Sequence, residues 1–247
     1  MQLHLNNSVV VVVGGASGIG RASAEAFAAE GASVVIWDIA ENVGEVAGSL
    51  DRSTGQRVDI SSEDAVNAAV EQTQREVGPI DILVHAAAVG SGRFGFPFTN
   101  LSPSDWAHVL NINIQGMVNV AHAVAPELVK RGSGSMVFVA SVAGQIGSPT
   151  DPPYSASKAA NINFAQVMAK DLATSNVRVN TVCPGMVRTP LNRSVWKSWN
   201  DRQSAADQLS YDDWAAQKIA QLVPLGRWQR PEDVANMIVF LSSEKDW

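Results

Sequence analysis

Short apolar runs alternate along the chain with longer segments in which apolar residues recur at a helical period. The runs contain mostly Val and Ile without polar alternation, which is typical of strands buried on both faces of a parallel sheet. We also expect a strand just before Asp59. The apolar runs are Val9–Val13, Ser33–Trp37, Ile82–His85, Met136–Ala140 and Val177–Val182.

The segments between these runs predict helices. Ser62, followed at once by two acidic residues, is typical of a helix start, and Pro231 before Glu232 is another. Alternating strands and helices favour βαβ units with right-handed crossovers, so we predict an α/β fold with a single doubly wound parallel sheet. The helical segments are Ile19–Glu30, Ser62–Val77, Ser104–Lys130, Tyr154–Thr174 and Glu232–Ser243.

Composition narrows the class of protein. The 247 residues, 46% hydrophobic, suit one domain over residues 1–247, and a net charge of −6 without runs of Lys or Arg argues against a nucleic-acid partner. A single cysteine, Cys183, excludes an intrachain disulfide and a cysteine-rich metal site. No window approaches the roughly 20 apolar residues of a membrane span, and the first residues do not resemble a signal peptide. We therefore expect a cytoplasmic protein without a metal or a membrane partner.

Four glycines lie between the first strand and the first helix, in the stretch VVVVVGGASGIG. They either give the strand a flexible exit or let a diphosphate approach bare backbone at a helix N-terminus. Counted from Gly14, the glycines at 14, 18 and 20 have the spacing GxxxGxG. The motif alone leaves both interpretations open.

Asp38 favours the second interpretation. It ends the second strand, 18 residues after Gly20, where a carboxylate can accept both hydroxyls of an adenosine ribose and repel a 2′-phosphate. No Arg or Lys stands beside it in the sequence, which favours NAD over NADP; the alternative is a surface Asp. Asp59, after the third strand, is a further candidate for contact with the adenine end.

The stretch YSASK places Tyr154 and Lys158 on one helix face. A phenol with a pKa of about 10 must have it lowered by about 3, or roughly 4 kcal/mol, to act as a base near pH 7. A cation at about 4 Å supplies energy of that order at an effective dielectric constant near 20. We predict that Lys158 lowers the pKa of Tyr154, that Ser141 donates to a substrate oxygen, and that Asn113 holds a water against the lysine.

Taken together, these motifs resemble the classical short-chain dehydrogenases/reductases over nearly the whole chain. The matching stretches are GGASGIG, the strand-ending Asp38, NINIQG, ASVAG, YSASK, NTVCPGMVRTP and PLGRWQRPEDVANMIVFLSS. The resemblance implies a Rossmann fold with strand order 3-2-1-4-5-6, a seventh strand that is missing or lies beyond the sequence, and a homodimer or homotetramer. It also implies a substrate lid at about residues 190–222.

The resemblance further implies roles for individual residues. Tyr154 is the base, Lys158 binds the nicotinamide ribose, Ser141 positions the carbonyl, and Asn113 supports a proton relay. The Pro184–Gly185 turn lies under the nicotinamide, while Val187 and Thr189 contact its carboxamide or the phosphate. The positions that we assign to cofactor contact are Gly14, Ser17, Gly18, Ile19, Gly20, Asp38, Ile39, Asp59, Ile60, Ala87, Tyr154, Lys158, Pro184, Gly185, Val187 and Thr189.

Three features depart from the family pattern. Gly14 replaces the usual Thr of the glycine turn, and the NNAG stretch after the fourth strand reads HAAA, from His85. We expect His85 to be a packed strand-end residue, with a catalytic role as the alternative. The chain stops at Trp247, where relatives continue into a last strand and tail, and we expect that such a tail is omitted from the sequence.

Three segments are expected to form the substrate pocket: Gly90–Leu101, Gly144–Pro153 and Leu191–Leu222. The Trp residues of the last segment either line an apolar cavity or pack its own helices or a neighbouring subunit. Arg93, Arg188 and Arg193 either meet a substrate carboxylate or are solvated.

We predict NAD(H)-dependent interconversion of a secondary alcohol and a ketone, by hydride transfer with Tyr154 as general acid/base. The alternatives are a protein that senses the dinucleotide without turnover and a structural subunit.

Overall fold

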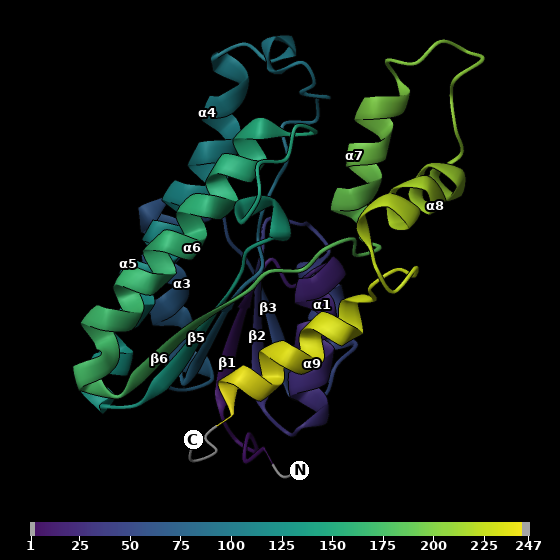
Figure 1. Ribbon diagram of the computed structural model, residues 1–247. Helices are drawn as coiled ribbons and strands as arrows, with labels where there is room; N and C mark the ends of the chain where they lie inside the picture. Colours follow the sequence, from purple (N-terminus) through teal and green to yellow (C-terminus); the bar gives the residue numbers. More distant parts are fainter. Residues whose placement is uncertain (1–2, 244–247) are drawn as a thin grey trace.

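The computed structural model describes residues 3–243, which form a parallel sheet between two layers of helices (Figure 1). The sheet has six strands in these residues, in the order β3-β2-β1-β4-β5-β6, which confirms the predicted fold class and strand order. The predicted seventh strand, missing or beyond the sequence, falls after Ser243, outside the described residues. The strands are β1 (Val9–Val13), β2 (Ser33–Asp38), β3 (Ser53–Arg57), β4 (Ile82–His85), β5 (Gly134–Val139) and β6 (Val177–Val182).

Side chains alternate between two apolar layers along each central strand, because successive residues of a strand point to opposite faces. Val11 and Val13 of β1 face one layer, and Val10 and Val12 face the other. All four are fully buried. This explains why the run lacks polar alternation.

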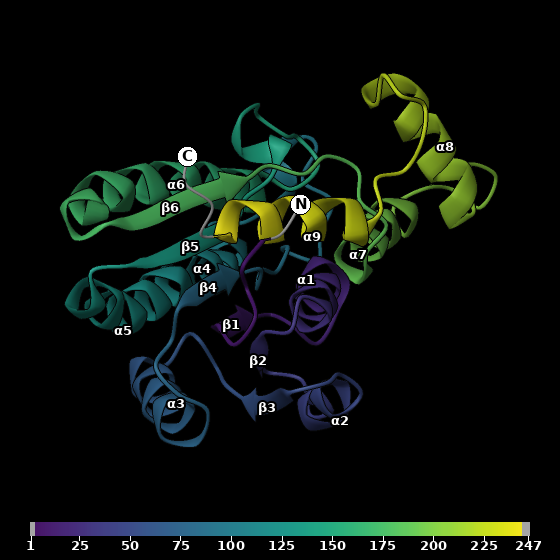
Figure 2. The same ribbon diagram turned by 90° about the horizontal axis from the view of Figure 1, so that it is seen from below.

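The first layer contains α3 (Glu63–Glu76), α5 (Gly116–Arg131) and α6 (Pro152–Leu172). The second contains α1 (Gly18–Ala29), α2 (Val43–Gly48) and α9 (Pro231–Ser242). Figure 2 shows α1 and α2 on one side of β1 and β2, with α3 on the other. The Ser62 hydroxyl caps α3 by accepting from the Ala65 N–H, as the sequence predicts.

The predicted helix Ser104–Lys130 is interrupted. It consists of α4 (Ser104–Leu110) and α5, joined by a π-helical turn at Asn111–Gln115. Such turns occur at functional sites, and this one contains Asn113. The short helix α2 is not predicted, because it has six residues, two of them glycine.

The segment at about residues 190–222 forms α7 (Pro190–Asn200) and α8 (Tyr211–Leu222), which project beyond the carboxyl ends of the strands (Figure 1). Tyr211 and Trp214 are buried in a small apolar cluster that also includes Trp196, Trp199 and Trp228. The Trp196 Nε1–H donates to the Leu209 carbonyl at 3.1 Å. These side chains therefore pack the helices of their own segment, and their contact with a substrate or a neighbouring subunit stays a prediction.

No helix within residues 3–243 is long and apolar enough to cross a membrane.

Candidate active site

The predicted site residues gather at the carboxyl ends of the strands, where open α/β sheets bind ligands. The glycine turn follows β1, Asp38 ends β2, Ala87 follows β4 and Ser141 follows β5. The Pro184–Gly185 turn follows β6. The topology thus brings segments from most of the chain to one edge of the sheet.

The glycine turn is built on close backbone approaches. Gly14 has φ +76°, and a Cβ there would lie 2.6 Å from the backbone N and Cα of Ala87. A Cβ on Gly20 would lie 2.1 Å from the Gly14 carbonyl oxygen. Both glycines are therefore required for packing. Because Gly14, Gly18 and Gly20 carry the GxxxGxG spacing, Gly14 is the first glycine, and the family's Thr position falls on Val13 rather than on Gly14.

Helix α1 begins at this turn with features that suit an anion. Within residues 3–243, the Ser17 hydroxyl makes no capping hydrogen bond, and the first turn of α1 holds no acidic residue. Gly18 has φ +55°, and a Cβ there would lie 3.4 Å from Cγ2 of Thr189. Ile19 packs partly against the core. The N-terminus of α1 therefore leaves backbone N–H groups and the helix dipole for a diphosphate.

Asp38 is tied directly to the glycine turn. Its Oδ2 accepts from the Ala16 N–H at 2.9 Å, and its Oδ1 accepts from the Ala40 N–H at 3.0 Å. The next side chain, Ile39, is 58% exposed, which leaves an apolar surface beside the carboxylate.

A cation does stand near Asp38, so the sequence-based expectation of none is wrong. Arg57 ends β3 and pairs with Asp38 in the parallel register. The Arg57 Nε–H donates to the Ile39 carbonyl at 3.1 Å, and Arg57 Nη2 lies 3.9 Å from Glu41 Oε1. Sequence inspection misses Arg57 because 19 positions separate it from Asp38.

Asp59 and Ile60 have local roles in the structure. Asp59 Oδ1 accepts from the N–H and the hydroxyl of Ser61, at 3.0 and 2.7 Å. Ile60 is buried beneath α5, where a Cβ on Gly116 would meet its side chain at 2.7 Å. The Ile60 carbonyl accepts from the Asn119 side chain at 2.9 Å.

Asn113 is completely buried and connects two segments of the site. Its Oδ1 accepts from the Val89 N–H at 2.8 Å, and its Nδ2–H₂ donates to the Val89 carbonyl at 2.9 Å. Nδ2 also lies 3.0 Å from Ser157 Oγ on α6. The side chain therefore holds the loop after β4 against α6, and its role in holding a water against Lys158 stays a prediction.

Tyr154 and Lys158 lie on the first turns of α6, which Asp151 caps. Burial raises the pKa of Tyr154 to about 12, while hydrogen bonding with the Ser141 side chain acts to lower it. Lys158 Nζ lies 5.6 Å from the centre of the Tyr154 ring and donates to the Val139 carbonyl at 2.7 Å. In the chain by itself burial therefore opposes ionisation of the phenol, and the lowering of its pKa by Lys158 stays a prediction.

Lys158 is itself almost fully buried, with 2% of its surface exposed. Burial lowers its pKa to about 8, and the nearby Cys183 acts to raise it. Lys158 is thus mostly charged at neutral pH, and it loses its proton at a lower pH than an exposed lysine does.

The turn after β6 is held by backbone contacts. The Val142 N–H donates to the Pro184 carbonyl at 3.0 Å, and the Gly185 N–H lies 3.3 Å from Gln229 Oε1. In the part of the chain that the structure describes, no atom lies within 4 Å of a Cβ placed on Gly185. Val187 is buried and bridges to Gln229.

Asp151 lies in the segment Gly144–Pro153, which the sequence predicts for the pocket, although it gives this residue no role of its own. It is buried, and its Oδ2 accepts from the Ser91 N–H at 2.8 Å, while burial raises its pKa. An Asp directly before Pro-Pro at a helix start was the available signal.

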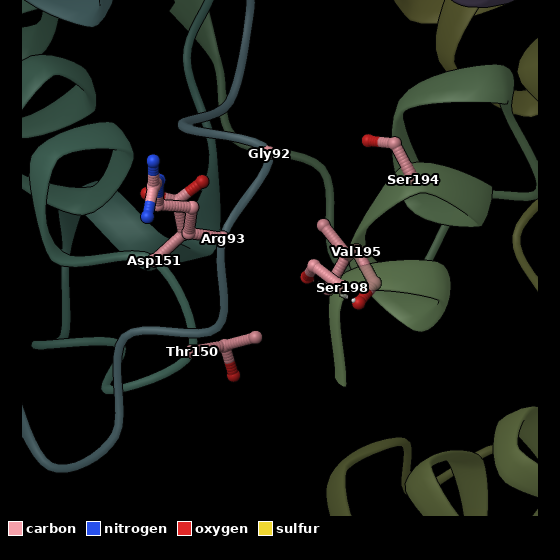
Figure 3. A pocket seen from close by; sticks show the side chains of 7 residues that line it. All are labelled: Gly92, Arg93, Thr150, Asp151, Ser194, Val195 and Ser198. Atoms are coloured by element: carbon pink, nitrogen blue, oxygen red, sulfur yellow. Dashed lines mark hydrogen bonds between the residues drawn. The ribbon is translucent and has the colours of Figure 1, made fainter. Parts of the chain in front are cut away.

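A narrow cleft lies beside Asp151. Figure 3 shows Ser194, Val195 and Ser198 of α7 on one side of the cleft and Thr150 and Asp151 on the other, with the Arg93 side chain lying beside Asp151. It is lined by Gly92, Arg93, Thr150, Asp151, Ser194, Val195 and Ser198.

The three arginines considered for substrate binding have protein partners. Arg93 pairs with Asp105 at 3.1 Å, and Arg188 pairs with Asp212 at 2.9 Å. The Arg193 guanidinium lies 5.3 Å from the centre of the Tyr211 ring. The side chains of Arg93 and Arg188 are nevertheless more than half exposed, and substrate contact by any of the three arginines stays a prediction.

Comparison with known proteins identifies the class. Residues 8–200 match the family model of the short chain dehydrogenases, and the chain belongs to this family of oxidoreductases, which bind a nicotinamide dinucleotide.

Three relatives illustrate the range of the family. The chain is 33% identical to the 3-oxoacyl-[acyl-carrier-protein] reductase FabG of Thermotoga maritima, covering 98% of this chain and 93% of that protein. It is 35% identical to cis-4-hydroxycyclohexanecarboxylate dehydrogenase of Sinomonas cyclohexanicum, covering 96% and 89%. It is similar in structure to L-sorbose reductase from Gluconobacter frateurii complexed with NADPH and L-sorbose, with a TM-score of 0.88 at 29% identity, covering 99% and 92%.

Proposed function

We propose that the protein is an NAD(H)-dependent oxidoreductase that interconverts a secondary alcohol and a ketone. The observation that carries the proposal is the meeting of Ser141, Tyr154 and Lys158 at the sheet edge that also holds the glycine turn. The uncapped start of α1 and the close backbone packing of the turn suit a dinucleotide diphosphate.

The proposed roles follow from the protonation states. The nicotinamide, when bound, accepts or supplies the hydride. Tyr154 donates its proton to the ketone oxygen in reduction, and its high pKa in the free chain keeps that proton available. In the reverse direction its phenolate takes the hydroxyl proton, so nearby positive charge must lower the pKa of Tyr154. Ser141 donates to the same substrate oxygen.

Lys158 and Asn113 complete the proposed set. Lys158 supplies the positive charge behind the phenol and binds the nicotinamide ribose. Asn113 keeps α6 and the loop after β4 in place, through its bonds to Ser157 and Val89.

The preference for NAD is proposed from Asp38. Its carboxylate is fixed at the glycine turn, where it would accept ribose hydroxyls and repel a 2′-phosphate. Arg57 opposes this preference, because it can pair with a phosphate, but its Nε–H is engaged by the Ile39 carbonyl. The proposal includes ribose contact at Asp38, diphosphate contact at Ser17 to Gly20, and nicotinamide contact at the Pro184–Gly185 turn.

The proposal also covers the domain, the substrate, the assembly and the location of the protein. Residues 1–247 act as one domain, and α7 and α8 close over the substrate as a lid. The substrate is a small molecule, the assembly is a homodimer or homotetramer, and the location is the cytoplasm.

The first experiment is a pair of fluorescence titrations with NADH and NADPH. We expect NADH to bind at least about tenfold more tightly, which corresponds to about 1.4 kcal/mol. Asp38→Ser should reduce or reverse this ratio. Adding Arg57→Ala to that variant should weaken NADPH binding again, because Arg57 can pair with the 2′-phosphate. Failure to bind either dinucleotide would overturn the enzyme proposal, and an unchanged ratio in Asp38→Ser would overturn the NAD preference.

The second experiment is a substrate panel chosen from the relatives' names. It contains a 3-oxoacyl thioester, L-sorbose and cis-4-hydroxycyclohexanecarboxylate. Turnover of a panel member, followed by NADH absorbance, would identify the direction and the class of substrate.

A further inference from the structure

His85 is a buried titratable residue that the proposed mechanism does not use. It ends β4, where it pairs with Val13 of β1 and Phe138 of β5, and only 1% of its surface is exposed. Paired residues of parallel strands point to the same face, and Val13 and Phe138 belong to the layer that contains α5 and α6. The His85 ring lies 5.8 Å from that of Phe138, at an interplanar angle of 31°.

The Nε2 atom of His85 has no hydrogen-bond partner among residues 3–243. A buried polar atom without a partner costs about 1–3 kcal/mol, so a residue of this kind calls for a physical explanation. The neighbouring buried polar side chains differ, because Asn113 and Ser157 are hydrogen-bonded to each other.

Lys158 lies on the same side of the sheet. Its Nζ donates to the carbonyl of Val139, the residue after Phe138, and this is its one hydrogen-bond acceptor in the described part of the chain. An ammonium group has three N–H donors. The site therefore contains a buried ammonium with unused donors and a buried imidazole with an unused nitrogen.

The two groups also interact electrostatically. Burial, followed by the charge of Lys158, lowers the pKa of His85 to about 3. His85 is thus neutral at every pH at which Lys158 titrates, and it can act on Lys158 as an acceptor but not as a charge. The other titratable groups that act on this pair or on Tyr154 are Cys183, after β6, and Asp151, before α6.

We infer that His85 is a positioning residue that offers the Nε2 lone pair to the Lys158 ammonium through one buried water, and so keeps Lys158 charged behind Tyr154. This inference rests on the role of Lys158 in the proposed function. It also gives a reason for His at the strand end where the family motif has Asn, whose shorter side chain carries its polar atoms nearer the backbone.

The contact is tested without turnover by ¹⁵N NMR of the four histidines, with His85 assigned through His85→Gln. We expect the Nε2 shift of His85 to be that of an unprotonated nitrogen from pH 5 upward and to change as Lys158 titrates near pH 8. Lys158→Met should remove this change, and Cys183→Ser should retain it. A shift that stays constant from pH 6 to pH 10, or a change that persists in Lys158→Met, would overturn the inference.

The functional consequence is tested by the pH dependence of NADH turnover with the panel substrate that proves active. His85→Phe removes the acceptor, so the charged form of Lys158 is less stabilised, and activity should be lost at a pH about one unit lower on the alkaline side. His85→Gln places a polar atom about as far from the backbone as Nε2 and should keep the pH profile of the parent protein. His85→Asn, with a shorter side chain, should not.

Gln56→Leu is the matched control, because Gln56 Oε1 is also buried on the sheet without a partner but lies on β3. Its profile should equal that of the parent. Identical profiles for His85→Phe and the parent, or an equal shift in Gln56→Leu, would contradict the inference. If no panel member is turned over, the proposed function fails on that assay, and the NMR result still decides on the His85–Lys158 contact.

Discussion

Burial governs the protonation states of the three titratable residues at the centre of the site. It raises the pKa of Tyr154 and lowers those of Lys158 and His85. The neutral phenol and the buried ammonium are each the form that the proposed reduction requires. At the scale of single residues, burial thus affects the pKa values of the site more than any single charged pair does.

Replacement of Tyr154 by Phe separates an enzyme from a dinucleotide sensor. We expect Tyr154→Phe to lower kcat at least about 10²-fold, because a general acid/base contributes about 10²–10⁴-fold, and to leave NADH binding unchanged. Tyr211→Phe removes the only other phenol of the chain, which donates to Asn192, and should reduce kcat far less. Full activity in Tyr154→Phe would contradict its assignment as acid/base.

Lys158→Met should make the protein more stable while it loses activity. With its pKa lowered from 10.5 to about 8, the folded chain holds this proton less tightly than the unfolded chain does, which costs about 3 kcal/mol at pH 7. We expect Lys158→Met to raise the free energy of unfolding by about 1–3 kcal/mol at pH 7. This range allows for the loss of the hydrogen bond to the Val139 carbonyl.

The gain should shrink as the pH rises from 8 toward 10.5, since Lys158 in the parent chain then loses its proton too. Denaturant unfolding at pH 7 and pH 10 measures both values. A variant that is less stable than the parent at pH 7 would contradict the assigned cost of the buried charge.

At the scale of elements, turns and helix ends place the functional groups. The glycine turn packs against the segment after β4, and the π-helical turn lets Asn113 reach Val89 and Ser157. The Asp151 cap starts α6 with Tyr154 on its first turn. Each of these is a local backbone feature with a long-range partner.

Gly14→Ala should disrupt the first of these elements. The residue has φ +76° and no room for a Cβ beside Ala87, so we expect a loss of about 1–3 kcal/mol in unfolding free energy and weaker NADH binding. Gly44→Ala, in α2 with no atom of the described residues within 4 Å of the new Cβ, should be neutral or slightly stabilising. Equal stabilities for the two variants, measured by denaturant unfolding, would argue against a packing role for Gly14.

At the scale of the whole molecule, the two faces of the sheet differ in the polarity of the side chains buried on them. One layer, with α5 and α6, carries the buried polar set from His85 to Lys158, while the other, with α1 and α9, is apolar around the glycine turn. The segment of α7 and α8 has its own aromatic cluster. Its apolar side chains therefore pack largely on one another, apart from the two layers of the main core.

Global stability should fall in acid because of His85. The unfolded chain binds a proton on His85 near pH 6.5, whereas the folded chain does so near pH 3, so stability is lost as the pH falls between these values. We expect this residue to contribute about 4–5 kcal/mol of loss between pH 7 and pH 3. His85→Gln should lose correspondingly less stability over that range in denaturant unfolding, and an equal loss in both proteins would contradict the low pKa.

The sequence by itself determined the elements that depend on neighbouring residues. Apolar runs located five of the strands, Ser62 located a helix start, and the spacing of Gly14, Gly18 and Gly20 located the turn between β1 and α1. These features are local, because side-chain alternation, capping and positive φ each involve a few adjacent residues. The motifs around Ser141, Tyr154 and Lys158 likewise indicated the family.

Tertiary structure alone decided what depends on residues far apart in the chain. It placed Arg57 beside Asp38 through the register of β2 and β3, and it gave Asn113 its partners on Val89 and Ser157. It also determined that Lys158 is buried and that burial raises the pKa of Tyr154. A pKa depends on how much water reaches a group and on the charges around it, and both are set by segments that only folding brings together.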